Sequence, residues 1–174
     1  MARAEHGAAL ADRLRPDVLA AANINPHSRL ATDYLNHFNN VVMLLELVPD
    51  MPDMAEDVRG WAPATYEDYF HASHFRERDL AVAAYRAADA AIRDDFDRAI
   101  THLDCVMAEA LQLIETGDPT DPVVAHRIRG IVNDRLKPGI SAASGIVNGA
   151  PLLSSPIHDP GESEAQAAVD ELFP

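Results

Sequence analysis

Histidine is the residue type that first suggests chemistry in this chain, because eight of the 174 residues are histidine. Histidine and carboxylate side chains bind Zn²⁺ or Fe²⁺ when the helices of a bundle project them inward. On two helical segments such residues recur at spacings of three or four, which places them on one helix face. The candidate ligands are Asp33 and His37 on the first segment, Glu67, His71 and His74 on the second, and His102 on a third.

These ligands would leave one coordination position of a Zn or Fe ion open for chemistry. In having histidine and carboxylate residues on helices, the chain resembles ferritin-like, hemerythrin-like and DinB-like helical bundles. It has no Glu-x-x-His pair. The alternative interpretation is therefore a set of partly exposed histidines along helix boundaries, with no cofactor.

A second candidate for chemistry is the run Ala125-His126-Arg127-Ile128-Arg129-Gly130. A histidine that accepts a phosphoryl group needs exposure, a cation to bind the phosphate and a small residue one turn on. Arg129 and Gly130 have these properties. The run resembles the His-x-Leu-Lys-Gly signature of histidine phosphotransfer domains, over about residues 96–131. The resemblance implies that His126 is a phosphoacceptor, and an ordinary surface histidine is the alternative.

The third candidate is the C-terminal segment 164–173, which follows a linker rich in Ser, Pro, Gly and acidic residues at 154–163. Val169, Leu172 and Phe173 fall on one helical face and would anchor a helix in a groove. The segment resembles the short acidic peptides by which flagellar-switch proteins and chemotaxis phosphatases bind a response regulator. The alternative is that it folds back onto the core of its own domain.

Composition predicts the elements that must position these residues. Thirty alanines against ten aromatic residues favour helix over strand. Apolar periodicity predicts helices over 29–48, 66–76 with continuation to 87, 89–116 and 122–136, with a weaker Ala-rich candidate over 1–22. We therefore expect an all-α antiparallel bundle of four or more helices over residues 1–153, followed by a linker and tail over 154–174.

Capping residues refine these boundaries. Ser28 and Thr65 are each predicted to cap the N-terminus of a helix. Asp121 does the same for the segment that opens with Pro122. Lys137-Pro138-Gly139 is expected to end that helix, which leaves residues 139–153 as a short helix or a packed loop.

The first predicted helix has two faces. Its apolar stripe is formed by Tyr34, Phe38, Val41, Leu45 and Val48. Its polar face, which carries Asn36, His37, Asn39 and Asn40, either lines a ligand pocket or contacts the connection at 49–63, where Trp61 is expected to contact the core.

The longest predicted helix, 89–116, carries one cysteine and a cluster of charges. Cys105 falls within the apolar pattern and is predicted to be buried. Asp94, Asp95 and Asp97 with Arg93 and Arg98 predict a solvated face with ion pairs. No coherent catalytic set of residues is found by spacing.

The net charge of −14 argues against nucleic acid and anionic membranes as partners. No apolar run approaches the roughly 20 residues of a membrane span, and the start of the chain lacks a signal-peptide core, so the sequence favours a cytoplasmic protein. Residues 32–68 carry eight acidic side chains and one arginine, residues 159–174 five acidic side chains and no base, and only 118–158 is slightly positive.

Together these patterns predict a non-enzymatic bacterial regulatory or adaptor protein that acts through helix-mediated contacts, with a response regulator as one candidate partner. A Zn- or Fe-binding bundle that uses His37, His71 and His74 is the first alternative, and phosphotransfer through His126 is the second. The sequence leaves the oligomeric state and the identity of the partner open.

Overall fold

The computed structural model describes residues 11–149, which fold into helices with no β-strand in that range. The elements are α2 (Pro16–Ala21), the 3-10 helix η1 (Thr32–Leu35), α3 (Asn36–Leu47), α4 (Met54–Arg59), α5 (Tyr66–Ala72), α6 (Arg78–Arg86), α7 (Ala90–Thr116), α8 (Pro122–Gly130), the π-helix η2 (Ile131–Leu136) and α9 (Lys137–Val147). The all-α prediction is confirmed. The linker and the tail with Val169, Leu172 and Phe173 lie outside the described residues.

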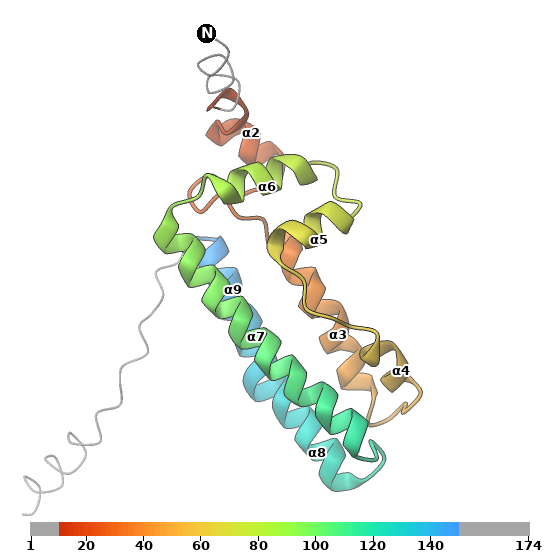
Figure 1. Ribbon diagram of the computed structural model, residues 1–174. Coiled ribbons are helices and arrows are strands. Elements are labelled where there is room, and N and C mark those ends of the chain that lie inside the picture. Colours follow the sequence, from red (N-terminus) through yellow and green to blue (C-terminus); the bar gives the residue numbers. More distant parts are fainter. Residues whose placement is uncertain (1–10, 150–174) are drawn as a thin grey trace, which may run out of the picture.

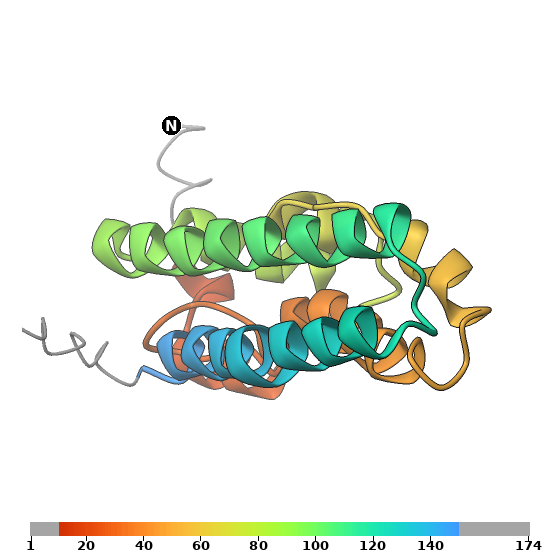
Figure 2. The ribbon, with the colours of Figure 1, turned by 90° about the horizontal axis from the view of Figure 1, so that it is seen from below.

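The long helix α7 and the continuous helix formed by α8, η2 and α9 run antiparallel beside each other (Figure 1). Helix α3 packs against this pair, and Figure 2 shows α7 in one layer with α8–α9 below it. Short helices cover the ends, with α4 near the α7–α8 turn and α5 and α6 at the opposite end. None of the helices within residues 11–149 is long and apolar enough to cross a membrane.

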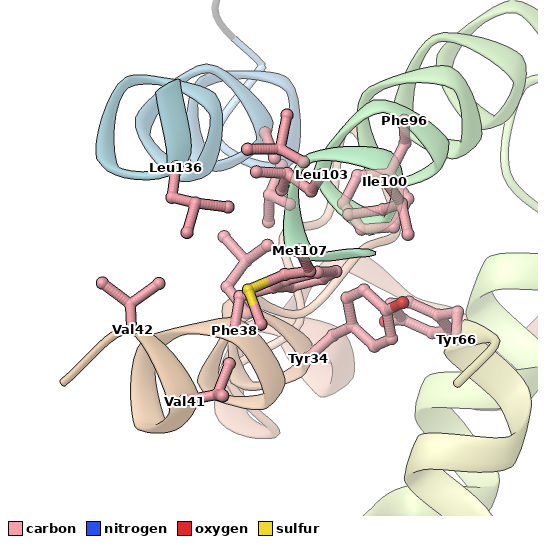
Figure 3. Close-up of a cluster of buried hydrophobic side chains, with 14 of the residues drawn as sticks. Tyr34, Phe38, Val41, Val42, Tyr66, Phe96, Ile100, Leu103, Met107 and Leu136 are labelled. Carbon is pink, nitrogen blue, oxygen red and sulfur yellow. The ribbon is translucent and has the colours of Figure 1, made fainter. Parts of the chain in front are cut away.

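The core lies where α3, α7 and the α8–α9 helix meet (Figure 3). The predicted apolar stripe from Tyr34 to Val48 is fully buried. Phe96, Leu103 and Met107 of α7 pack against this stripe and are 0% exposed. Leu136 of η2, also 0% exposed, completes the core from the α8–α9 helix. The 3.6-residue period from Tyr34 to Val48 therefore identified the buried face of this segment correctly.

Two of the predicted N-caps are present. The Thr65 hydroxyl accepts a hydrogen bond from the backbone N–H of Asp68 at 3.1 Å. The Asp121 carboxylate accepts from the N–H groups of Val123 and Val124 at 2.7 and 3.4 Å. Each cap pairs an N–H group that the first helical turn leaves without an acceptor.

The predicted cap at Ser28 is wrong, and the helix begins later, with η1 at Thr32. Ser28 is fully buried, and its hydroxyl donates to the carbonyl oxygen of Val147 at 2.5 Å. The turn at residues 23–29, which precedes η1, holds Asn23 and Arg29 in the left-handed region, at φ 57° and 60°. Ser28 thus ties this turn to the end of α9 instead of capping a helix.

The predicted helix end at Lys137-Pro138-Gly139 is also wrong, because the helix continues to Val147. The turn before the proline, η2, is a π-helix. Proline lacks an N–H group, and its ring clashes with the carbonyl of the residue four positions earlier in a regular α-helix. A wider π turn relieves this clash without ending the helix. Gly139 then packs so closely on α7 that a Cβ would lie 2.7 Å from Leu103 Cδ2.

Cys105 is exposed on α7, which contradicts the predicted burial. The buried positions on this part of α7 are Leu103, Val106 and Met107. Cys105 follows Leu103 by two residues, so its side chain lies about 200° around the helix axis from that of the buried Leu103 and points away from the core.

Candidate functional site

A pocket of about 340 Å³ lies between the middle of α7 and the segment that leads into α5. Its walls combine aromatic rings with carboxylates, and no lysine or arginine lines it. We call it the tyrosine pocket. The lining residues that matter below are Tyr34, Tyr66, Tyr85, Phe96, Asp97, Thr101 and Asp104.

The aromatic wall is built from rings that pack on one another. Tyr66 stacks on Tyr85 with 4.6 Å between ring centroids and 17° between planes. Tyr34 lies 5.3 Å from Tyr66 and 5.7 Å from Phe96. Figure 3 shows Tyr34 and Tyr66 side by side at the edge of the core. Because these rings belong to η1, α5, α6 and α7, the wall exists only in the folded bundle.

The tyrosine hydroxyl groups are held by protein partners. Tyr34 donates to the carbonyl oxygen of Ala64 at 2.7 Å, and Tyr66 accepts from the N–H of Ala31 at 2.9 Å. Tyr85 donates to the Asp97 carboxylate, 2.9 Å from either oxygen. Burial raises the pKa of both Tyr34 and Tyr66, so these hydroxyl groups stay protonated at neutral pH.

Asp104 differs from the other polar groups of the pocket. Its Oδ1 atom is buried and has no hydrogen-bond partner within residues 11–149. Burial raises the pKa of this carboxyl group because the charged form loses hydration. The Asp104 charge, with that of Asp97, further raises the pKa of Tyr34. The pocket therefore has a negative potential that its own lining does not neutralise.

The segment before α5 is held by His37 and Trp61. The Trp61 Nε1–H group donates to the carbonyl oxygen of His37 at 3.1 Å, and the two rings stack at 5.0 Å. Burial lowers the pKa of His37. The predicted contact of Trp61 with the core is thus confirmed, and it positions the chain that continues into Pro63, Ala64 and Thr65 of the pocket wall.

The structure does not gather the candidate metal ligands. His71, His74 and His102 are exposed, and His37 is half-buried against Trp61. Glu67 forms an ion pair with Arg86 at 2.5 Å, and Asp33 lies beside a different groove. Between residues 11 and 149 no group of three or more His, Cys, Asp or Glu side chains is arranged to hold a metal ion. Binding of Zn or Fe stays a prediction from the sequence.

The candidate phosphoacceptor His126 is exposed on α8, as phosphotransfer requires. Arg129, its proposed phosphate ligand, forms an ion pair with Asp50 at 3.2 Å. Gly130 ends α8 where the π turn begins. Phosphotransfer also stays a prediction.

The polar face of α3 divides between its two predicted environments. His37 contacts the 49–63 connection through Trp61. Asn36 and Asn39 instead line an open groove of about 480 Å³ between α3 and α9, together with Lys137, Ser141 and Ser144. This groove is larger than the tyrosine pocket, but Lys137 is already paired there with Glu46 at 2.5 Å.

Sequence reasoning missed Asp104 and Tyr85 and assigned Asp97 to a solvated ion-paired face. Asp97 lies at the pocket and accepts from Tyr85, whereas Asp95 does pair with Arg98 as predicted. A signal was present, because Asp97, Thr101 and Asp104 are spaced i, i+4 and i+7 on α7. That spacing gives a polar stripe beside the buried Ile100, but only tertiary structure places the tyrosines opposite it.

Comparison of the chain with protein-family models, with curated proteins and with solved structures gave no significant match.

Proposed function

We propose that this protein is a non-enzymatic regulatory protein whose helical bundle binds a small organic molecule in the tyrosine pocket. The observation that carries this proposal is the buried Oδ1 atom of Asp104, which has no partner in the described chain. An unpaired buried polar atom costs about 1–3 kcal/mol. A ligand that pairs with it removes this cost.

The shape and lining of the pocket support binding of a small molecule. Its volume of about 340 Å³ falls in the range typical of ligand sites. Such sites combine apolar walls with a few polar groups that orient the ligand. Here Pro63, Ala64 and the half-buried Tyr85 supply the apolar surface, and the carboxylates supply the polar groups.

The chemistry of the lining favours binding over catalysis. Tyr34 and Tyr66 are held by backbone partners, and their raised pKa values make them poor acids or bases at neutral pH. Asp97 is held by Tyr85. Asp104 and the exposed Asp68 are the carboxylates left to contact a ligand, and neither lies beside a histidine or a second base in the lining.

Filling the pocket should abolish ligand binding without unfolding the bundle. Thr101 is exposed at the pocket, so Thr101→Trp places an indole in the cavity without disturbing the core. In a thermal-shift screen of small organic compounds, a ligand at 100 times its Kd should raise the Tm of the wild type by about 5 °C or more. The Thr101→Trp variant should lose this shift.

The control is Thr116→Trp, which adds the same side chain at an exposed position near the far end of α7. It should keep the shift. If no compound stabilises the wild type, or if Thr101→Trp responds as the wild type does, the pocket is not a ligand site.

An adaptor role through helix-mediated contacts is the second candidate function, and a stripe of exposed apolar side chains favours it. Met43, Leu47 and Met51 are 59%, 39% and 45% exposed. They follow one another at intervals of four residues, and the Met51 N–H donates to the Leu47 carbonyl oxygen at 2.7 Å. The three side chains therefore form one stripe, which we call the α3 stripe. Exposed methionines suit protein-binding surfaces because they adapt to different partners.

Charge on the α3 stripe should weaken partner binding if the adaptor proposal is right. We propose the receiver domain of a response regulator as the partner. The double variant Met43→Glu/Leu47→Glu should weaken its binding by about tenfold or more, as measured by fluorescence anisotropy against a set of purified receiver domains. Val123→Glu, at another exposed apolar position, is the matched control and should bind as the wild type. Failure of every receiver domain to bind the wild type would contradict the adaptor proposal.

A further inference from the structure

We infer that the α3 stripe is a self-association surface, on which two copies of this chain pair antiparallel about a two-fold axis that passes through Leu47. The inference goes beyond the proposed ligand site and does not depend on it. It rests on three observations: the exposed apolar side chains of the stripe, their symmetric order, and the charges along its edge and beyond its end.

The stripe gathers most of the exposed apolar surface of the described chain. Four large apolar side chains are exposed within residues 11–149, and three of them are Met43, Leu47 and Met51. The fourth, Val123, lies on α8. Scattered exposed apolar residues need no explanation, whereas apolar side chains that lie together mark contact surfaces. The stripe therefore calls for a partner surface that is itself apolar.

The order of side chains in the stripe is the same in both directions along α3. Met43 lies four residues before Leu47, and Met51 lies four residues after it. A two-fold interface must be self-complementary, because the same patch faces itself. In an antiparallel pair the Leu47 side chains of both copies meet at the axis, and each Met43 meets the second copy's Met51. Methionine suits the outer positions because its unbranched side chain adapts to the surface it contacts.

The charges along one edge of the stripe are balanced. Glu46 and Asp50 form the next row on the helix, one turn apart. Glu46 is paired with Lys137 at 2.5 Å, and Asp50 is paired with Arg129 at 3.2 Å. All four side chains are 43–74% exposed, so a second chain can reach them. An antiparallel two-fold pair brings this edge against the same edge of the second copy, where each row offers carboxylates and cations to the other. The edges are therefore complementary in charge.

The acidic residues beyond the stripe favour the antiparallel arrangement over a parallel one. Asp53 precedes α4, and Glu56 and Asp57 lie in its first turn. All three are exposed. A parallel pair would place the α4 helices of both copies at the same end, where these carboxylates repel one another. An antiparallel pair places them at opposite ends.

The dimer should be weak and should tighten with salt. Its contact surface is a single stripe with its edge, and small interfaces of this kind form transient complexes, so we expect a Kd on the order of 10–100 μM. Each copy has a net charge of −14, which opposes association at low ionic strength. Salt screens this repulsion, whereas it does not weaken the contact between apolar side chains.

The first test is analytical ultracentrifugation of the full chain at concentrations up to about 1 mM, well above the expected Kd. The wild type should show a reversible monomer–dimer equilibrium, with a lower Kd at about 0.5 M NaCl than at about 0.05 M. Leu47→Glu should raise the Kd about tenfold or more, because the axis places the two glutamates face to face. Val123→Glu makes the same kind of change outside the stripe and should leave the Kd unchanged. An equimolar mixture of Leu47→Glu and Leu47→Lys should recover the dimer, which a folding defect would not allow.

The second test is disulfide cross-linking, which reports the register of the pair. It uses a Cys105→Ser background, because Cys105 is the only cysteine and is exposed. On oxidation Leu47→Cys should cross-link to itself, since the axis brings the two sulfur atoms within reach of each other. Met43→Cys should cross-link to Met51→Cys in a mixture of the two variants and not to itself. Val123→Cys should not cross-link.

Three results would overturn the inference. They are a wild type that stays monomeric at the highest concentration, a Kd that is the same for Leu47→Glu as for the wild type, and cross-linking of Met43→Cys to itself in preference to Met51→Cys. The adaptor proposal fails separately. If the wild type is monomeric but a receiver domain binds it, only self-association fails, and if the dimer forms but no receiver domain binds, only the adaptor proposal fails.

Discussion

Replacing Phe96 by alanine is expected to lower the free energy of unfolding by about 3–5 kcal/mol. Phe96 is completely buried on α7, with its ring centroid 5.7 Å from that of Tyr34 and 5.9 Å from that of Tyr66. The ring joins the bundle core to the tyrosine pocket. Alanine would leave a cavity that the rigid rings around it cannot fill, so the lost burial and the lost contacts add.

Urea denaturation followed by circular dichroism measures this effect. Val123→Ala is the control, because Val123 is 68% exposed on α8 and its truncation should change the free energy by less than about 0.5 kcal/mol. The two variants remove apolar side chains from the two extremes of burial. A loss below about 1 kcal/mol for Phe96→Ala would show that α7 does not pack as described.

Deletion of Asp134 from the π turn is expected to destabilise the protein by about 3 kcal/mol or more. A π turn holds one more residue than the α-helical turn it replaces, so the deletion returns the helix to regular α geometry. Pro138 would then lie inside a regular α-helix, where its ring clashes with the carbonyl four residues earlier. Asp134 is exposed and forms no ion pair in the described structure, so its side chain adds little to this effect.

The companion variant Pro138→Ala separates this mechanism from a general effect of shortening the chain. In the deletion background it should restore most of the lost stability, whereas in the full-length chain it should change stability by about 1 kcal/mol or less. Thermal denaturation of the wild type, the two single variants and the combined variant gives the coupling free energy between the deletion and Pro138→Ala. Absence of rescue by Pro138→Ala would show that the π turn does not exist to accommodate the proline.

The fold class and most helix positions were predictable because their signals are local. The stripe from Tyr34 to Val48 repeats with the helical period, and all its members are buried. Thr65 and Asp121 cap their helices through partners two or three residues away. A short-range pattern such as these contains both partners of the interaction that it predicts.

The errors fall where a distant partner competes with the local signal. Ser28 has the chemistry of an N-cap, but its hydroxyl group donates a hydrogen bond to the carbonyl oxygen of Val147 on α9 instead. Pro138 is a helix breaker by local rules, yet the helix is held against α7 on both sides of the proline, and the break becomes a π turn. The tertiary contacts of Gly139 and Leu136 outweigh the local preference.

The sequence by itself determined an acidic, all-α chain, the buried face of the segment from Tyr34 to Val48 and the caps that begin two other helices. Tertiary structure alone decided which polar groups meet. It kept the candidate ligands His37, His71, His74 and His102 apart, and it placed tyrosines from η1, α5 and α6 opposite Asp97 and Asp104 of α7. The physical reason is that helix period and capping depend on residues within a few positions, whereas a pocket depends on side chains from separate helices. The Oδ1 atom of Asp104 is an example, because only the folded bundle removes that atom from water and leaves it without a partner among the described residues.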